Sequence, residues 1–216
     1  MEDLRNYINQ LRHDFSKMSL DEHQVEKHPI IQFEKWFKDA VDAHLPDPNA
    51  FVLSTASASG RPSSRVLLLR NFSEKGFVFY TNYQSRKGEE LRTNPYAAMN
   101  FFWPELERQV RIEGVIEQQN SEESDVYFKL RPDGSKLGAW TSPQSKVINS
   151  REELESNYQK TSEQFDGKEI PRPSFWGGYL LKADKIEFWQ GRPSRLHDRL
   201  LFTYQDSHWK MERLAP

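Results

Sequence analysis

Three arginines, a histidine and a tryptophan fall within one short segment near the C-terminus, Phe188 to Arg199. Arginine donates paired hydrogen bonds to phosphate or carboxylate groups, and tryptophan offers an aromatic face. Histidine is the side chain whose charge changes most readily near neutral pH. The segment is therefore a candidate for binding a flat, anionic molecule. The alternative is a solvated loop after a strand, because single Arg and His residues are common on surfaces.

A second cationic pair, Arg86 and Lys87, stands where a helix is expected to begin. Positive charge at a helix N-terminus opposes the helix dipole unless an anion binds there. A bound phosphate would remove that conflict, and a solvated basic turn is the alternative.

Arg65 and Arg70 stand at the two ends of an apolar run that is expected to form a strand. The side-chain period of two places them on opposite faces of that strand, so they are expected to serve different ligands or regions. Alternatively, both side chains simply reach water from the strand ends.

Tyr127 and Arg131 lie four residues apart on an expected helix, and Ser135 follows in a Pro-Asp-Gly turn. All three side chains donate hydrogen bonds, which suits a phosphate monoester, although the surface end of a helix is an equally simple interpretation. Three further side chains are candidates for hydrogen bonds to the edge of a heteroaromatic ring: Gln109, Gln144 and Ser145.

The composition excludes several function classes. The 216 residues carry 30 basic and 32 acidic side chains, so the chain lacks the basic field of a general nucleic-acid binder. Without Cys there is no disulfide, thiolate nucleophile or Cys-ligated metal. The six His show no HxxxH or HxH spacing, and neither a GxSxG elbow, a P-loop nor a GxGxxG fingerprint is present. No metal site is predicted. Because no apolar run reaches the ~20 residues of a membrane helix, a cytoplasmic protein without membrane contact is expected.

These candidate residues need a scaffold, and the sequence favours a β-rich one. Phe33, Trp36, Phe37, Ala40 and Val41 fall on one stripe of an expected core helix. Short apolar runs separated by polar turns predict strands, at residues 51–56, 64–70, 76–82, 97–103, 109–118, 176–189 and 200–214. The first three runs are interpreted as a β-meander. Further helices are expected over 83–91, 120–130 and 150–165, the last two beginning at capping boxes. Strands around one helix suggest a barrel. Residues 1–28 are predicted to form a flexible arm, and residues 29–216 a single domain.

Taken together, these motifs resemble pyridoxamine/pyridoxine 5′-phosphate oxidases. The resemblance runs in order from about residue 30 to the C-terminus and rests on the following segments: RVLLLR at 65–70, FYTN at 79–82, SRK at 85–87, ERQV at 107–110, GAW at 138–140, QS at 144–145, SFWGG at 174–178, EFWQG at 187–191, RLHDR at 195–199 and RLAP at 213–216. It implies a mainly β fold with peripheral helices, a split β-barrel that binds FMN in clefts of a homodimer. The implied reaction oxidises pyridoxine or pyridoxamine 5′-phosphate to pyridoxal 5′-phosphate. The implied steps are hydride transfer to the flavin and electron transfer to O2, giving H2O2.

The resemblance also implies the roles of individual residues. It assigns the FMN phosphate and ribityl chain to Arg65, Arg86, Lys87 and Ser145, and the flavin to the strand Val66, Leu67, Leu68 and Leu69. It completes the cofactor site with Arg70, Tyr80, Thr81, Gln109, Gln144, Trp189 and Arg199. It assigns the substrate phosphate to Arg70, Tyr127, Arg131 and Ser135. Arg195 and His197 would be the catalytic pair that orients the 4′ carbon of the pyridine ring.

Two positions depart from the family pattern. Arg70 stands where lysine is usual, which keeps the charge and changes the geometry. Phe15 stands where tyrosine is usual, in the segment Leu11 to Phe15 that resembles the arm folding over the substrate, and Arg12 of that segment is assigned to the substrate. The remaining alternatives are a split-barrel flavin reductase, which need not keep the substrate residues, and a flavin or pyridoxal-phosphate binding protein without turnover.

Overall fold

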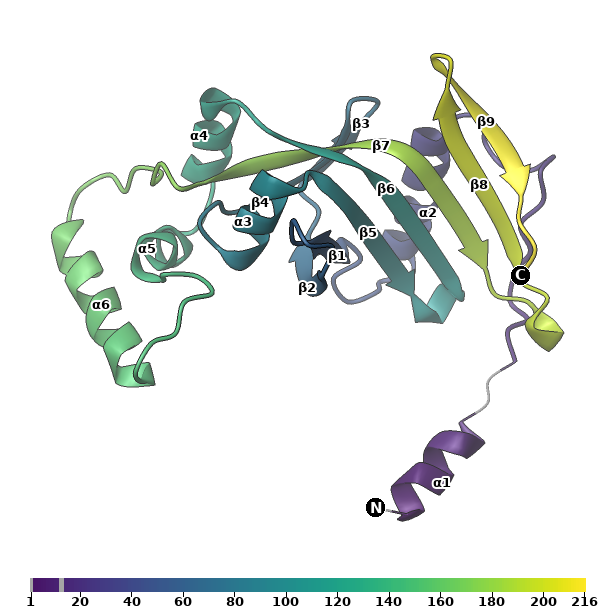
Figure 1. The fold of residues 1–216 in the computed structure, drawn as a ribbon, viewed down its shortest axis with the longest axis horizontal. Helices are drawn as coiled ribbons and strands as arrows, with labels where there is room; N and C mark the ends of the chain where they lie inside the picture. Colours follow the sequence, from purple (N-terminus) through teal and green to yellow (C-terminus); the bar gives the residue numbers. More distant parts are fainter. Residues whose placement is uncertain (1, 12–13) are drawn as a thin grey trace. The chain divides into compact units, whose positions relative to one another are not determined.

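The computed structural model describes residues 2–11 and 14–216 (Figure 1). The chain forms two compact units, each described here by itself. The first unit comprises Met1–Pro48, Asn100–Ile112 and Lys185–Pro216, and the second comprises Asn49–Met99 and Glu113–Asp184. A single domain over 29–216 with a flexible arm over 1–28 stays a prediction.

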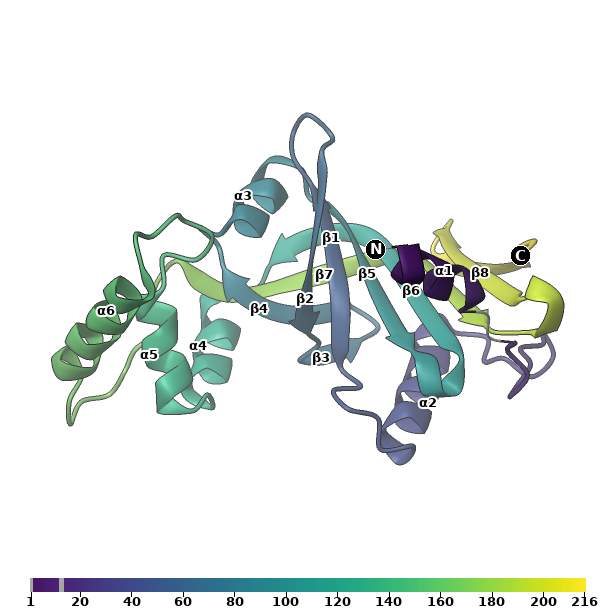
Figure 2. The same cartoon turned by 90° about the horizontal axis from the view of Figure 1, so that it is seen from below.

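The described residues form one nine-stranded sheet. Its strands are β1 Ala50–Ala56, β2 Pro62–Leu68, β3 Asn71–Ser73, β4 Gly76–Asn82, β5 Tyr96–Trp103, β6 Arg108–Gln118, β7 Trp176–Gln190, β8 Asp198–Gln205 and β9 His208–Arg213. Their order is β2-β1-β5-β6-β7-β4-β3, and β8 pairs with both β7 and β9. The pairs β1–β2, β3–β4, β4–β7, β7–β8 and β8–β9 are antiparallel, and Figure 2 shows β1 and β2 running side by side. The predicted mainly β fold is confirmed.

Peripheral helices accompany the sheet. They are α1 Glu2–Gln10, α2 Pro29–Asp42, α3 Arg86–Thr93, α4 Ser121–Lys129, α5 Asp133–Thr141 and α6 Arg151–Gln164, with short 3-10 turns at Pro104–Leu106 and Pro193–Arg195. Both predicted capping residues act as N-caps, because Asn120 accepts a hydrogen bond from the Glu123 N–H and Ser150 from the Glu153 N–H. Within the described part of the chain, no helix is long and apolar enough to cross a membrane.

In the first unit, α2 buries an aromatic stripe. The Phe33 ring meets Phe101 edge to face at 5.2 Å, and Trp36 meets Phe188 in the same way at 5.2 Å. Burying side chains of this size contributes about 1.5–3 kcal/mol each. The predicted helix is confirmed, although Val41 at the end of the predicted stripe is exposed.

In the second unit, β1 and β4 supply the core. Phe51, Leu53 and Phe79 are almost fully buried, and the Phe51 and Phe79 rings pack at 5.9 Å. In β4 nearly every residue is buried, so this strand is covered on both faces.

The predicted β-meander is wrong. β2 pairs with β1, but β4 pairs with β7, in register from Phe77 opposite Leu181 to Asn82 opposite Trp176. The short strand β3 occupies the other edge of β4. Local apolar patterns predict that a segment is a strand, but its partner is chosen by burial between segments far apart in the chain.

Two further elements differ from prediction. The Pro-Asp-Gly segment expected to be a turn is the start of α5, with Pro132 at the N-cap. The single strand expected over 200–214 is the hairpin β8–β9 (Figure 1). It turns at Asp206 and Ser207, which both have a positive φ as a tight two-residue hairpin requires.

Candidate functional site

Three cations of the second unit surround one cavity, and we call Arg65, Arg86 and Lys87 the cationic cradle. Arg65 extends from β2, whereas Arg86 and Lys87 begin α3 behind the N-cap Ser85. The cavity measures about 430 Å³. Cations at a helix N-terminus are electrostatically unfavourable by themselves, so this arrangement favours an anion in the cavity.

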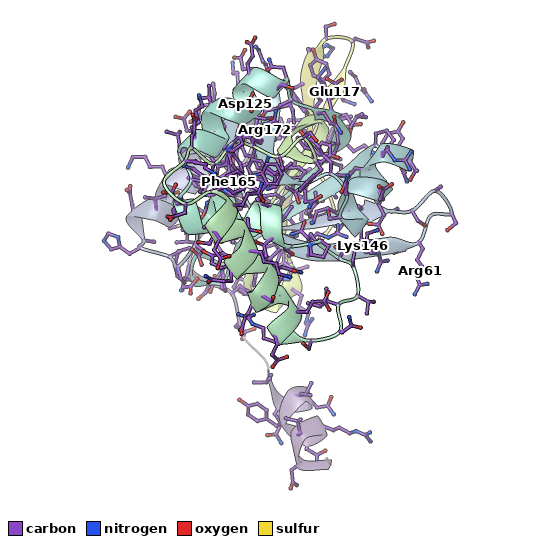
Figure 3. The ribbon with its side chains drawn as sticks, turned by 90° about the vertical axis from the view of Figure 1, so that its left-hand side faces the viewer. Arg61, Glu117, Asp125, Lys146, Phe165 and Arg172 are labelled. Atoms are coloured by element: carbon purple, nitrogen blue, oxygen red, sulfur yellow. The ribbon has the colours of Figure 1, made fainter. Side chains whose placement is uncertain are left out.

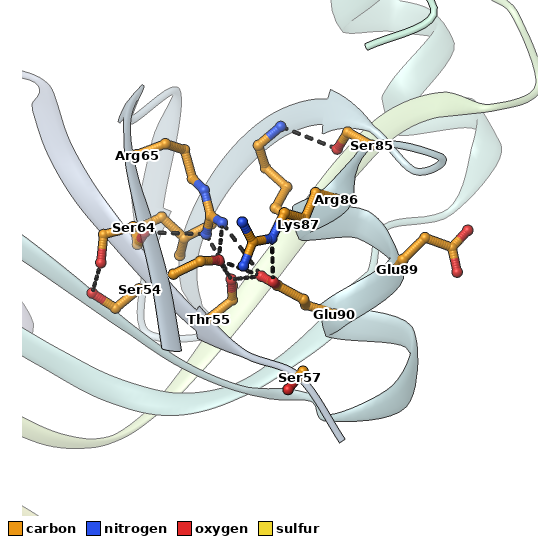
Figure 4. Close-up of polar contacts among 12 residues, drawn as sticks. Ser54, Thr55, Ser57, Ser64, Arg65, Ser85, Arg86, Lys87, Glu89 and Glu90 are labelled. Atoms are coloured by element: carbon orange, nitrogen blue, oxygen red, sulfur yellow. Dashed lines mark hydrogen bonds and ion pairs between the residues drawn. The ribbon is translucent and has the colours of Figure 1, made fainter. Parts of the chain in front are cut away.

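A buried carboxylate holds the two arginines of the cradle (Figure 4). Glu90 Oε1 accepts a hydrogen bond from Arg86 Nε at 2.9 Å. Its Oε2 accepts from Thr55 Oγ1 at 2.5 Å, from Ser63 Oγ at 2.6 Å and from Arg65 Nη2 at 3.3 Å. Burial by itself would raise the pKa of Glu90, but these hydrogen bonds lower that pKa to about 2. Glu90 therefore stays ionised at neutral pH.

The third cation, Lys87, is buried, and among the described residues it bonds only to neutral groups. Its Nζ donates to Thr81 Oγ1 and Ser85 Oγ, both at 3.1 Å, and to Gln144 Oε1 at 2.9 Å. Burial, and after it the neighbouring Arg65 charge, lower the pKa of Lys87 to about 8 against the opposing effect of Glu90. An anion in the cavity would stabilise the charged form of this lysine.

A second cavity, of about 300 Å³, shares Val66, Leu67 and Gln144 with the first. The remaining residues that line it are Leu68, Arg70, Tyr80, Thr81, Asn82, Tyr127, Arg131 and Trp176. Arg65 lines only the first cavity and Arg70 only the second, so the two ends of the apolar run serve separate spaces.

Aromatic rings surround Arg131, one of the two arginines of the second cavity. The Arg131 guanidinium lies 4.5 Å over the Trp176 ring and 5.4 Å over Phe128, while Tyr80 and Tyr127 stack at 3.9 Å. Burial lowers the pKa of Arg131. Among the described residues, its Nη1 is buried and has no hydrogen-bond partner. A buried donor without a partner is costly, so an anionic ligand in this cavity would satisfy it.

An ion pair fixes this aromatic wall to α4. Arg172 Nε donates to Asp125 Oδ1 at 2.6 Å, and Arg172 Nη1 donates to the Trp176 carbonyl at 2.6 Å. Figure 3 shows Asp125 and Arg172 beside each other. The start of β7, which carries Trp176, is thereby tied to the helix that carries Tyr127.

The first unit holds the predicted catalytic pair next to a cavity of about 620 Å³. His197 lies 4.7 Å from Trp189 and 5.6 Å from Phe15, measured between ring centroids. Arg195 and His197 both line the cavity. Arg195 is exposed and has a φ of 61°, a backbone conformation that is unusual for a residue with a side chain.

The protonation of His197 follows from its contacts. The Arg192 backbone N–H donates to His197 Nδ1 at 3.1 Å, so in the neutral ring the proton lies on Nε2. Burial lowers the pKa of His197, and the charge of Arg195 lowers it further against the opposing effect of Asp198. The ring is therefore a neutral N–H donor near pH 7.

Within the first unit, the segment around Phe15 packs against Glu107 and Gly191. A Cβ atom at Gly191 would approach Phe15 to 2.7 Å, so only glycine fits beneath this ring. The backbone N–H groups of Ser16 and Lys17 donate to Glu107 Oε2 at 2.9 and 3.0 Å. Phe15 is thus held beside His197.

Comparisons with known proteins identify the family. The family model described as pyridoxamine 5′-phosphate oxidase matches residues 37–165, and the model of the pyridoxine 5′-phosphate oxidase C-terminal dimerisation region matches 176–216. The pyridoxine/pyridoxamine 5′-phosphate oxidase of Paraburkholderia phymatum is 56% identical over 95% of this chain and 97% of its own. Its counterpart from a Cyanothece species is 51% identical over 97% and 98%. The chain belongs to the pyridoxine/pyridoxamine 5′-phosphate oxidase family. The resemblance found in the sequence is confirmed, and with it the class of enzyme, an oxidoreductase.

Solved structures extend the comparison. PhzG from Burkholderia lata, solved in complex with tetrahydrophenazine-1-carboxylic acid, is 30% identical and superposes with a TM-score of 0.87 over 93% of this chain and 99% of its own. A pyridoxamine 5′-phosphate oxidase-related FMN-binding protein from Nostoc punctiforme is 18% identical, with a TM-score of 0.69 over 85% and 97%, and shares the fold. The predicted split-barrel fold is confirmed.

Most residues that the family resemblance singles out in the second unit line the two cavities. The first cavity brings together Arg65, Val66, Leu67, Arg86, Lys87, Gln144 and Ser145. The second brings together Val66, Leu67, Leu68, Arg70, Tyr80, Thr81, Tyr127, Arg131 and Gln144. Ser135 is exposed on α5 and Leu69 is buried, and neither lines these cavities. The roles of all these residues stay predictions.

The remaining predicted site residues belong to the first unit: Gln109, Trp189, Arg195, His197 and Arg199. Trp189 on β7 lies opposite Arg199 on β8. Arg199 donates to Glu187 from Nε at 2.8 Å and from Nη2 at 3.1 Å. Arg12 lies outside the described residues.

Some residues of these arrangements were not predicted as site residues. Among them, Trp176 lines the second cavity, and Glu90 and Glu187 bind the arginines at positions 65, 86 and 199. A signal existed for Glu90, since it follows Arg86 by four residues on a helix. Nothing local pairs Glu90 with Arg65, because that contact spans 25 residues.

Proposed function

We propose that this chain is an FMN-dependent oxidase that converts pyridoxine 5′-phosphate and pyridoxamine 5′-phosphate to pyridoxal 5′-phosphate. The alcohol loses two electrons and two protons, and O2 takes up both pairs to become H2O2. The amine additionally consumes water and releases ammonia. Family membership supports the substrate class, and the names of the relatives state it for those proteins.

The cationic cradle is the proposed site of the FMN phosphate. Three cations and one fixed carboxylate leave a net positive cavity, which suits a phosphate dianion. The strand from Val66 to Leu69 would lie along the flavin, with Gln144 and Ser145 as hydrogen-bonding partners. When bound, FMN supplies the two-electron acceptor that amino-acid side chains lack.

The second cavity is the proposed site of the substrate phosphate. The partnerless Nη1 of Arg131 and the nearby Arg70 are the donors that such a group needs. Tyr127, Ser135 and Arg12 would complete the contacts. The observation that carries the proposal is this pair of cation-lined cavities, which share Val66, Leu67 and Gln144.

Arg195 and His197 would orient the pyridine ring. With its proton on Nε2 and its pKa lowered, His197 presents a hydrogen-bond donor without a positive charge. Its aromatic neighbours Trp189 and Phe15 fix the ring plane, so the pair would position the 4′ carbon rather than donate charge.

We further propose a homodimer with FMN at the interface between subunits. The description of the family model that matches residues 176–216 supports this assembly. Gln109, Trp189 and Arg199 would contribute to the cofactor site there. A cytoplasmic location stays a prediction.

The test mixes the FMN-loaded protein with pyridoxine 5′-phosphate without oxygen and follows flavin absorbance near ~450 nm. Bleaching that air reverses, with formation of pyridoxal 5′-phosphate and H2O2, is expected. Bound flavin that stays unbleached would contradict the proposal and point to a flavin or pyridoxal-phosphate binding protein. Bleaching by reduced nicotinamide but not by pyridoxine 5′-phosphate would point to a flavin reductase.

A further inference from the structure

Glu90 occupies a position that no predicted ligand contact explains. It is 6% exposed, yet it lies on α3 one turn after Arg86 and beside the first cavity. The two oxygens of its carboxylate bind arginines of two different elements. Oε1 binds Arg86 of α3, and Oε2 binds Arg65 of β2. Figure 4 shows dashed lines from this carboxylate to both guanidinium groups.

The way Glu90 binds Arg86 leaves the outer part of that guanidinium available. Glu90 takes the Nε hydrogen of Arg86. Among the described residues, the two Nη atoms of Arg86 have no hydrogen-bond partner, and the side chain is 59% exposed. The carboxylate thus fixes the guanidinium through Nε and leaves both Nη groups available. A planar, oriented pair of donors is what bidentate phosphate binding needs.

Hydroxyl groups keep the carboxylate in place. Thr55 and Ser63 both donate to Oε2, and both also accept hydrogen bonds from Arg65, at 2.6 Å and 2.5 Å. An incoming anion would have to break this closed set of bonds to displace Glu90. A carboxylate that merely competed for the arginines would lack such support.

We propose that Glu90 is a positioning residue for the cofactor phosphate: it holds Arg65 and Arg86 so that both meet one phosphate group. This inference rests on the proposed function, because it takes the cradle as the phosphate site. Glu90 itself does not touch the phosphate, from which its negative charge would be repelled.

The test measures binding of FMN and of riboflavin, which lacks the phosphate, by quenching of flavin fluorescence in the apoprotein. Glu90→Gln keeps the side-chain shape and removes the charge that orients both arginines. FMN affinity should fall ~10-fold, as expected when a supporting charged hydrogen bond is lost, while riboflavin affinity stays within ~2-fold. A merely structural role would weaken both ligands alike.

The matched control is Glu89→Gln on the same helix. Glu89 pairs with Arg92 on the exposed side of α3, and Figure 4 shows its carboxylate away from the cradle. This substitution should leave both affinities within ~2-fold. Thr55→Val removes one hydroxyl, which donates to Glu90 and accepts from Arg65, and leaves the Glu90 carboxylate in place. It provides a milder variant should Glu90→Gln fold poorly, with an expected ~3-fold loss for FMN alone.

A double-mutant cycle with Arg86→Met examines the mechanism. If Glu90 acts through the arginines, Glu90→Gln should cost less in the Arg86→Met background than in the wild-type background.

Different outcomes overturn different statements. A wild-type protein that binds FMN no better than riboflavin would overturn the proposed phosphate site and this inference with it. A wild-type preference for FMN that Glu90→Gln leaves intact, or increases, would overturn this inference alone.

Discussion

Arg65 and Arg131 are both partly buried arginines of the second unit, and burial lowers the pKa of both. Their surroundings differ. Arg65 is held by a carboxylate, two hydroxyls and the Leu53 carbonyl. Arg131 lies against the faces of Trp176 and Phe128 and keeps a buried Nη1 without a partner in the described part of the chain.

The difference suggests two kinds of binding. The hydrogen bonds that fix Arg65 come from the chain itself, so this side chain is already ordered before a ligand binds. Binding then loses little free energy to ordering the arginine, which suits a cofactor that remains bound. The hydrogen bonding of Arg131 is completed only by an outside anion, so much of its interaction energy is available to a substrate.

The largest effect is expected at the second cavity. Arg131→Met keeps the stem against Trp176 and removes the phosphate donors, so kcat/KM for pyridoxine 5′-phosphate should fall ~100-fold. FMN affinity should stay within ~2-fold. Steady-state kinetics and fluorescence titration measure the two quantities. Lys129→Met, an exposed cation of α4, is the control and should change neither. Equal losses in turnover and FMN binding would remove the proposed distinction between the two cavities.

The next effect concerns the cradle. Arg86→Met removes the available Nη donors and should weaken FMN ~30-fold while riboflavin affinity is retained. Arg92→Met, in the last turn of the same helix, is the matched control. Titration of each variant with FMN and with riboflavin measures the two affinities. If Arg86→Met lowered the affinity for riboflavin as strongly as the affinity for FMN, that result would argue against a phosphate contact.

FMN binding in the cradle should depend on pH because of Lys87, whose pKa is lowered to about 8. This dependence would distinguish the cradle from the cavity that contains Arg131. Below pH 8 the lysine is charged and attracts the phosphate dianion; above pH 8 it is neutral. FMN affinity should therefore decrease as pH rises through 8, by up to ~10-fold. Arg65 and Glu90 face Lys87 and keep their charges in this range. Titrations from pH 7 to 9.5 should show this decrease in the wild type and a flat profile in Lys87→Met.

The stability of the free protein should change in the opposite direction. The native pKa of Lys87 lies below its ordinary value of 10.5, so the unfolded chain binds more protons between pH 8 and 10.5. The contribution of Lys87 to the free energy of unfolding thus rises over this window. Denaturant unfolding of wild type and Lys87→Met over the same range measures that contribution as the difference between the two proteins.

The smallest effect is expected at the cap of α3. Ser85→Ala removes the hydroxyl that accepts the Gly88 N–H and also bonds Lys87, which should lower the free energy of unfolding by about 1 kcal/mol. FMN should weaken only a few-fold, roughly threefold. Ser150→Ala removes the equivalent cap of α6 and should cost similar stability without any change in FMN affinity. Thermal unfolding measures the loss of stability in each variant, and flavin titration measures the change in FMN affinity. A lower FMN affinity in Ser150→Ala would contradict the explanation that only the cap of α3 supports the FMN site.

Where the signal was local, sequence patterns singled out cations that line the two cavities, although their roles stay predictions. The cations at 86 and 87 were recognised from the helix start, and Arg65 and Arg70 from the ends of an apolar run. The cap residues Asn120 and Ser150 act as the sequence indicates. Each of these features depends on neighbours within a few positions, where helix and strand periodicities apply. The roles of the cofactor and substrate residues came from the family resemblance instead.

Long-range contacts escaped prediction. The partner of β4 is β7, about 100 residues later, and the carboxylate of Glu90 joins a helix to a strand. The start of α5 was interpreted as a turn because Pro, Asp and Gly favour turns, yet Pro132 and Asp133 also suit the first positions of a helix.

The sequence by itself determined most of the segments that become strands and helices, two of the helix caps, and which side chains are able to bind anions. These properties depend on periodicity and on backbone groups close in the chain. Only the tertiary structure decided that Glu90 lies between Arg65 and Arg86, and that Arg131 meets Trp176 with one donor unpaired. Such contacts are selected by burial and charge pairing between distant segments, and their energies arise only once the sheet has brought those segments together.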